Sequence, residues 1–158
     1  MSTEDRAIAH AEAHCASNGT KLTAKRKAVL RGLLQSNKAL SAYELADYCK
    51  EKLGESMPAM SVYRILEFLE GEQLVHKLKL ANRFVACIHI TCNHKHAVPQ
   101  FLICEQCHQV SEVSIKASTL RALRNNVENA GFRLASPQLE MNCLCEDCAR
   151  EALPDQQG

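Results

Sequence analysis

Tryptophan is absent from this chain of 158 residues, and aromatic residues make up only 4% of it. So few aromatic side chains exclude a large aromatic binding platform. The longest apolar runs are far too short to cross a bilayer, and the N-terminal segment has no apolar stretch of the signal-peptide type. The sequence therefore predicts a cytoplasmic protein without a membrane partner.

Positive and negative residues are also nearly balanced, because the formal net charge is only +1. A nearly neutral chain does not by itself indicate a nucleic-acid partner. Basic residues do gather in one short stretch: Lys21, Lys25, Arg26, Lys27 and Arg31. Such a run is usually a solvated helix face, so it supports phosphate contact only weakly.

Cysteine, by contrast, is abundant, with nine residues. In a reducing compartment this number favours metal or thiol chemistry over a disulfide framework. Four of the cysteines form two Cys-x-x-Cys pairs, here called clips: Cys104/Cys107 and Cys145/Cys148. Two clips supply the four thiolates that a tetrahedral zinc ion requires. We expect a structural zinc at these cysteines, and buried or redox-active cysteines are the alternative.

The first half of the chain has helical periodicity followed by a change of period. Thr23, the pair Ser41 and Glu44, and Gly54 are capping signals for the helices. Helices are expected over residues 3–18, 24–35, 42–53 and 58–70, and a hairpin over residues 74–79 and 83–87. This order is typical of a winged helix-turn-helix, in which the fourth helix enters the major groove and the hairpin is the wing.

The second half predicts a small α/β domain. Strands are expected at residues 101–104 and 110–115, then a helix over 119–130 capped by Ser118 and closed by Gly131, and a third strand over 132–141. The fold class is therefore α+β. The predicted domains are a DNA-binding domain at 1–87, a hinge with metal ligands at 88–97, and a dimerisation domain at 98–158 with a disordered tail.

The hinge and its surroundings are rich in metal-ligating residue types. Six of them lie close together in the sequence: His76, Cys87, His89, Cys92, His94 and His96. Glu112 follows shortly after the first clip. A second metal site built from both halves of the chain would fix their relative orientation. The alternative interpretation is that His76 is an ordinary wing residue and Cys87 a core thiol.

The whole arrangement resembles the ferric uptake regulator family from about residue 5 to residue 150. The resemblance is carried by Pro58, the Ser-Val-Tyr-Arg run ending at Arg64, the histidine cluster and the two clips. The subgroup that responds to zinc has a pattern matched here by His76, Cys87, His96 and Glu112, with His94 as substitute for His96. Independently, one thiolate in this ligand set favours zinc over Fe(II) or Mn(II).

The resemblance implies a zinc-dependent transcriptional repressor of zinc uptake genes. It implies two zinc ions per subunit, one structural and one regulatory, and a homodimer on a double-stranded, palindromic operator. The residues that it would bring to DNA are Tyr43, Ser61, Tyr63 and Arg64, with Lys25 and Arg26 at the phosphates.

Several other interpretations of the pattern are open. A family member that responds to iron, manganese or thiol oxidation is the main alternative. The Cys104-to-His108 segment fits covalent haem attachment, but that needs export and leaves the second clip unexplained. His89 and Cys92 could form a third metal site. Four protein ligands per site leave no open position, so we expect neither an enzyme nor a small organic substrate.

Overall fold

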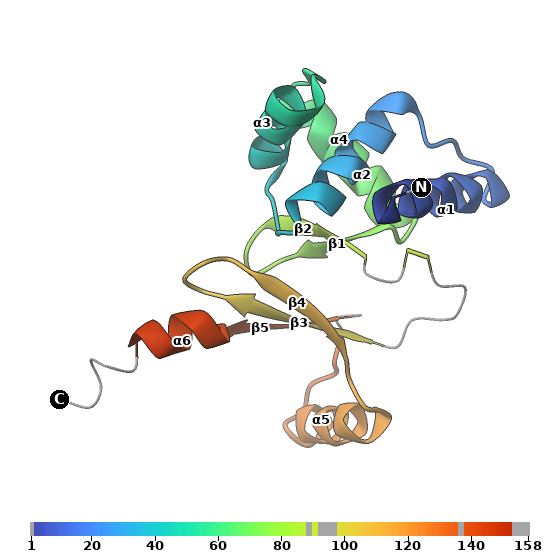
Figure 1. Ribbon diagram of the computed structural model, residues 1–158. Coiled ribbons are helices and arrows are strands. Elements are labelled where there is room, and N and C mark those ends of the chain that lie inside the picture. Colours follow the sequence, from blue (N-terminus) through green and yellow to red (C-terminus); the bar gives the residue numbers. More distant parts are fainter. Residues whose placement is uncertain (1, 88–89, 92–97, 136–137, 153–158) are drawn as a thin grey trace. The chain divides into compact units, whose positions relative to one another are not determined.

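The computed structural model describes residues 2–87, 90–91, 98–135 and 138–152 (Figure 1). Four of the expected or alternative metal ligands, His89, Cys92, His94 and His96, lie outside the described residues. The chain divides into two compact units, residues 1–93 and 94–158. Each unit is described below on its own.

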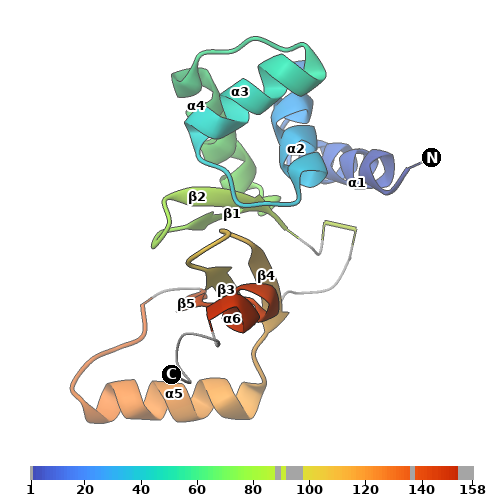
Figure 2. The ribbon, with the colours of Figure 1, turned by 60° about the vertical axis from the view of Figure 1, so that its left-hand side comes forward.

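The first unit consists of four helices followed by a two-stranded hairpin. Its elements are α1 (Thr3–Ser17), α2 (Ala24–Ser36), α3 (Ala42–Leu53), α4 (Ala59–Gly71), β1 (Val75–Leu78) and β2 (Arg83–Ala86). The helices lie on one side of the antiparallel hairpin (Figure 2). This is the winged helix-turn-helix that the sequence predicts, with α4 as the recognition helix and β1–β2 as the wing.

The helix ends follow from local capping chemistry. The Thr23 side chain accepts a hydrogen bond from the Arg26 N–H at the start of α2, as expected. Ser41 and Glu44 form the expected capping box at the start of α3, and Gly54 ends that helix at a φ of +69°. α4 begins differently, because its cap is Pro58, which provides no side-chain hydrogen bond. The first turn of the recognition helix therefore lacks a side-chain cap.

The core of the first unit lies between all four helices and the wing. Its fully buried side chains include Leu30, Leu45, Leu66 and Phe84. Gly32 permits the close approach of α2 and α3, since a Cβ at this position would lie 2.9 Å from the Leu45 Cδ1 atom. Packing of one apolar face from each helix is therefore what holds the recognition helix in place.

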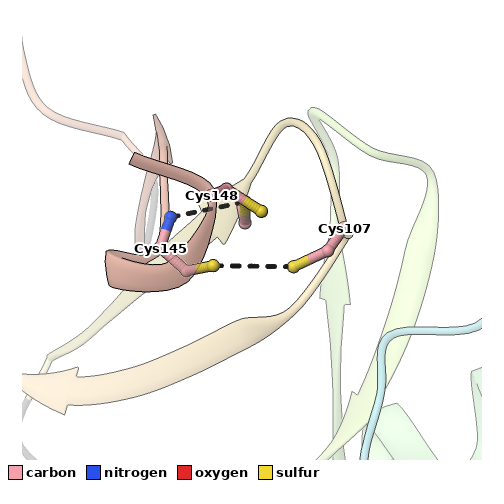
Figure 3. Close-up of side chains that lie close together, drawn as sticks. Cys107, Cys145 and Cys148 are labelled. Atoms are coloured by element: carbon pink, nitrogen blue, oxygen red, sulfur yellow. Dashed lines mark hydrogen bonds between the residues drawn. The ribbon is translucent and has the colours of Figure 1, made fainter. Parts of the chain in front are cut away.

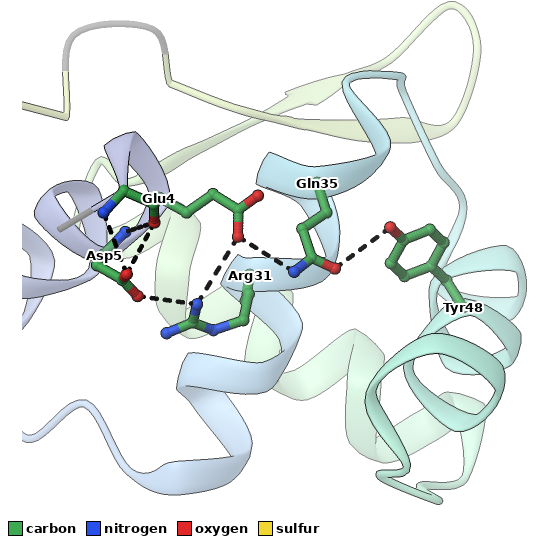
Figure 4. A network of polar contacts seen from close by, with 6 residues as sticks. Glu4, Asp5, Arg31, Gln35 and Tyr48 are labelled. Carbon is green, nitrogen blue, oxygen red and sulfur yellow. Dashed lines mark hydrogen bonds and ion pairs between the residues drawn. The ribbon is translucent and has the colours of Figure 1, made fainter.

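A polar network links α1 to α2 and α3 (Figure 4). The Arg31 guanidinium donates a hydrogen bond of 3.2 Å to Asp5 and lies 3.7 Å from Glu4. Gln35 links Glu4 to the Tyr48 hydroxyl on α3 through hydrogen bonds of 3.1 and 3.3 Å. α1 is thus joined by side chains to α2 and, through Gln35, to α3.

The second unit is a three-stranded sheet with two helices. Its elements are β3 (Pro99–Cys104), β4 (Val110–Ser114), α5 (Ala117–Asn129), β5 (Leu139–Cys143) and α6 (Glu146–Ala152). The strand order is β4-β3-β5, with β4 antiparallel and β5 parallel to β3. The expected β-β-α-β order is confirmed.

Two local expectations in the second unit are wrong, and one helix was not predicted. α5 begins after Lys116 without a side-chain cap, so Ser118 is not the cap. The third strand does not span residues 132–141, because its extent is set by pairing with β3, from Gln100 opposite Leu139 to Cys104 opposite Cys143. α6 was not expected from the sequence.

None of the helices in the described ranges is both long and apolar enough to span a membrane.

Candidate metal centres and DNA-binding surface

Parallel pairing of β5 with β3 brings the two clips together. Cys104 ends β3, and Cys107 lies in the turn that leads to β4. Cys145 precedes α6, and Cys148 lies within that helix. The four Sγ atoms all lie within 4.8 Å of one another. Residues more than 35 positions apart in the sequence thus meet at a single point, as the clip spacing predicts.

The sulfur positions fit a zinc ion. Tetrahedral zinc with Zn–S bonds of about 2.3 Å places its sulfurs about 3.8 Å apart. The Cys107 and Cys145 sulfurs point toward each other at 3.7 Å (Figure 3). Cys104 and Cys148 are buried, whereas Cys107 is exposed. The cluster therefore has the donor set and the dimensions of a structural zinc site, with one ligand at the surface.

The thiols of this cluster differ in their acidity. Backbone N–H groups, first that of Cys107 and then that of Cys145, lower the pKa of Cys104 to about 6. The Cys145 donor lies 3.3 Å from the Cys104 sulfur. A hydrogen bond with the Cys145 thiol, together with burial, raises the pKa of Cys148 far above its ordinary range. Four adjacent thiolates would repel one another, so some of the thiols stay protonated when no metal is bound. A divalent cation displaces these protons and binds all four sulfurs as thiolates.

A second pair of ligand types lies on the wing. His76 is opposite Val85 in the hairpin, and Cys87 follows Val85 by two residues, so both side chains lie on one face. The Cys87 N–H donates to the Leu74 carbonyl at 2.9 Å, which extends the pairing beyond β2. A ring nitrogen of His76 and the buried Cys87 sulfur lie within 4.8 Å.

The remaining predicted ligands belong to the second unit or lie outside the described residues. Glu112 is half-buried on β4, opposite Phe101 of β3. His96 and its substitute His94 are outside the described residues. Cys15 and Cys49 are core residues, and burial raises the pKa of both thiols, that of Cys49 to about 11.

The predicted DNA contacts fall into two groups. Tyr43, Ser61, Arg64 and Lys25 are exposed, Tyr43 by 75%. Two others have contacts within the first unit. The Tyr63 hydroxyl accepts a hydrogen bond of 3.3 Å from Lys77. The Arg26 guanidinium lies 3.6 Å over the Phe68 ring and donates to the Lys21 carbonyl at 2.7 Å. These two side chains therefore also hold the unit together.

Sequence reasoning missed one exposed apolar residue at the start of the recognition helix. Met60 has 64% of its surface exposed, although it stands in an otherwise apolar segment. The signal was available, because Met60 does not share the helical spacing of the buried residues Val62, Leu66 and Leu69.

Together, the fold and the cysteine cluster define a winged-helix protein with four cysteines arranged as metal ligands. The ferric uptake regulator family matches residues 17–142, and the chain belongs to this family. The zinc uptake regulation protein of Escherichia coli (strain K12) is 32% identical over 146 residues, which cover 92% of this chain and 83% of that protein.

Two solved structures also resemble the chain over most of its length. A zinc uptake regulator complexed with zinc and DNA has a TM-score of 0.80 and 28% identity, covering 97% of this chain and 99% of the other. The crystal structure of holo XcZur has a TM-score of 0.70 and 35% identity, covering 90% and 96%.

Proposed function

We propose that this chain is a zinc-dependent, DNA-binding transcriptional repressor that controls zinc uptake genes. The observation that carries the proposal is the similarity, over nearly the whole chain, to a zinc uptake regulation protein and to a regulator structure with zinc and DNA. The winged helix supplies a reading head, and the cysteine cluster supplies the chemistry for zinc. Its proposed place of action is the cytoplasm, and its proposed role is regulatory, not enzymatic.

The proposed structural zinc is held by Cys104, Cys107, Cys145 and Cys148. Its role is to stabilise the fold of the second unit. Among the described residues of that unit, only Phe101, Ile103, Cys104, Ile115 and Cys148 are buried apolar residues, and two of them are proposed ligands. α5 contributes none. A core this small needs a further source of stability, which metal binding supplies in small domains.

The proposed regulatory zinc has four ligands: His76, Cys87, Glu112 and His96, with His94 as substitute. His76 and Cys87 are supported by their position on one face of the wing. Glu112 and His96 are assigned from the ligand pattern of the zinc-responsive subgroup of the family. One thiolate among nitrogen and carboxylate donors favours zinc over harder divalent ions. The proposed stoichiometry is therefore two zinc ions per subunit.

The proposed mechanism uses the wing as the sensing element. Ligands drawn from the wing, the hinge and the second unit would restrict the hinge when zinc is bound. The two recognition helices of a dimer would then be held at the spacing of successive major grooves. A hundredfold gain in DNA affinity corresponds to about 2.7 kcal/mol of coupling, and linkage requires DNA to tighten zinc binding equally.

The proposed assembly is a homodimer on a palindromic, double-stranded operator. Two features of the second unit support it. β5 is an edge strand of the described sheet, and a second copy could extend the sheet there. α5 has apolar residues at helical spacing, among them Leu120, Leu123 and Val127, but these side chains are only partly buried. Both features leave surface for a partner subunit.

A regulator of the same family that responds to thiol oxidation is the second candidate. The lowered pKa of Cys104 favours it, because a thiolate is the form that oxidants attack. Burial of Cys104 opposes it, since the residue is only 3% exposed. Zinc retention and DNA binding after mild peroxide treatment separate the two: a zinc sensor keeps both, and a thiol sensor loses both.

The direct test combines metal analysis with DNA binding. The purified protein is analysed for metals, and its binding to duplexes from a zinc uptake promoter is measured by fluorescence anisotropy in buffered zinc, iron(II) and manganese(II). We expect two zinc ions per subunit and tight binding in zinc alone. Equal binding in iron(II) or manganese(II) at their cellular levels would instead assign the other metal. Binding without any metal would refute metal regulation.

A further inference from the structure

Large apolar side chains are exposed at one part of the first unit. Among its described residues, these side chains are Tyr43, Met60 and Leu80. Tyr43 lies in the first turn of α3, Met60 in the first turn of α4, and Leu80 in the wing turn. In a winged helix-turn-helix these segments are the ones that approach DNA. Elsewhere in the described part of this unit, such side chains are at least partly buried.

Met60 and Tyr43 line a common hollow of about 250 Å³. Its lining also includes Ala59, Tyr63, Phe84 and Asn82 of the wing turn. The lining side chains are mostly apolar. The flexible thioether of Met60 can therefore reorient at the mouth of the hollow without losing a polar partner.

The spacing of Met60 and Arg64 is informative. Residues four apart lie on the same helix face, with Cβ atoms about 5–6 Å apart. Arg64 is exposed, and Ser61 beside Met60 is exposed as well. A helix that brings Arg64 to a base edge must bring Met60 to the same groove. Since base pairs are spaced by about 3.4 Å, Met60 reaches the pair one or two steps away.

The major groove contains one apolar group, the C5-methyl of thymine. An exposed methionine on the reading face matches that group and no hydrogen-bonding edge. We propose that Met60 is a specificity-determining residue that contacts a thymine methyl one or two base pairs from the base read by Arg64. This inference rests on the proposed DNA-binding function and adds a sequence preference to it.

The test removes the methyl group without changing base pairing. Short duplexes that the zinc-loaded protein prefers are selected from a random pool, and each thymine is replaced in turn by deoxyuridine. Loss of one buried methyl contact is expected to weaken wild-type binding about fourfold. At that position, Met60→Ala should bind thymine and deoxyuridine duplexes equally, and Met60→Leu should keep the preference.

Leu80→Ala is the matched control, because it removes another exposed apolar side chain from the same part of the unit. It should leave the ratio of thymine to deoxyuridine affinity unchanged. The proposal is overturned if no thymine methyl matters, if Met60→Ala keeps the ratio, or if only Tyr43→Ala abolishes it. Failure of the wild type to bind any duplex in zinc would overturn the proposed function itself, together with this inference.

Discussion

The Arg83 guanidinium on the wing lies 2.6 Å from the carboxylate of Glu44, the residue that closes the capping box of α3. A second link runs beside it, because Leu40 and Phe84 exchange backbone hydrogen bonds of 3.0 and 2.8 Å. The wing is therefore fastened to the start of the helix that precedes the recognition helix. His76 lies on this same hairpin, so a restraint on His76 would reach the start of α3 through these two links.

The Arg83–Glu44 pair gives a pH-dependent contribution to stability. Burial acts to raise the pKa of Glu44, but hydrogen bonds from Ser41 and Arg83 outweigh it and lower this pKa below its ordinary value of 4.5. A lowered pKa means that the ionised carboxylate stabilises the fold above pH 4.5. That contribution is lost as the pH falls through the pKa of the folded state.

Glu44→Gln keeps the capping oxygen and removes the charge. We expect it to lower the free energy of unfolding by about 0.5 kcal/mol at neutral pH, because both partners are partly exposed. The difference should shrink as the pH falls below 4.5 and Glu44 becomes protonated in the folded protein. Urea unfolding of both proteins across this pH range measures it. In an Arg83→Met background the effect should shrink, and a difference independent of pH would contradict the assignment.

Gly32 is expected to be intolerant of a larger side chain. Gly32→Leu should lower the stability of the first unit by about 1–3 kcal/mol, because even a Cβ would overlap Leu45 in the α2–α3 contact. Thermal unfolding measures the loss. Gly71→Leu is the control, since a Cβ there meets no atom within 4 Å. Equal destabilisation by the two changes would show that the close helix approach is unimportant.

Arg64 and Lys25 should affect DNA binding in different ways. Arg64→Ala is expected to cost about 1–3 kcal/mol on the preferred duplex and to relax the preference at one base pair. Lys25→Ala should weaken binding to all duplexes alike and reduce the salt dependence by about one unit of slope. Titrations at several salt concentrations distinguish them. A uniform loss for Arg64→Ala would make it a phosphate contact.

Cys104→Ser should remove the structural zinc and destabilise the second unit. Cys104 is buried and is one of the four cysteines of the cluster, so its loss leaves three thiolates for a tetrahedral ion. Zinc analysis and size-exclusion chromatography measure the loss of metal and of the dimer. Cys143→Ser is the control, because Cys143 lies outside the cluster. A stable dimer with full zinc content after Cys104→Ser would refute the structural role of this zinc site.

The features that the sequence predicts well are local ones. Thr23, the Ser41–Glu44 box and Gly54 act within one helical turn, so the ends of α2 and α3 follow from the residues around them. The hairpin is local too, since a short turn fixes its register. The two clips predict a shared metal ion for the same reason: in each clip, a local turn brings two cysteine side chains together as a pair of ligands.

The features that it predicts poorly depend on distant partners. The extent of β5 is set by its pairing with β3, which continues to Cys143 and could not be read from alternation alone. Ser118 resembles a cap, but the chain enters α5 two residues earlier, at Lys116. The contacts of Arg26 with Phe68 and of Tyr63 with Lys77 likewise arise from tertiary packing.

The most direct test of zinc sensing is DNA binding by Cys87→Ser across buffered zinc concentrations. Cys87 supplies the proposed soft ligand on the wing and lies outside the four-cysteine cluster. We expect a folded dimer that retains its structural zinc but needs at least a hundredfold more free zinc to bind the operator, a shift of about 2.7 kcal/mol. Binding by Cys87→Ser at the same free zinc as the wild type would contradict the account.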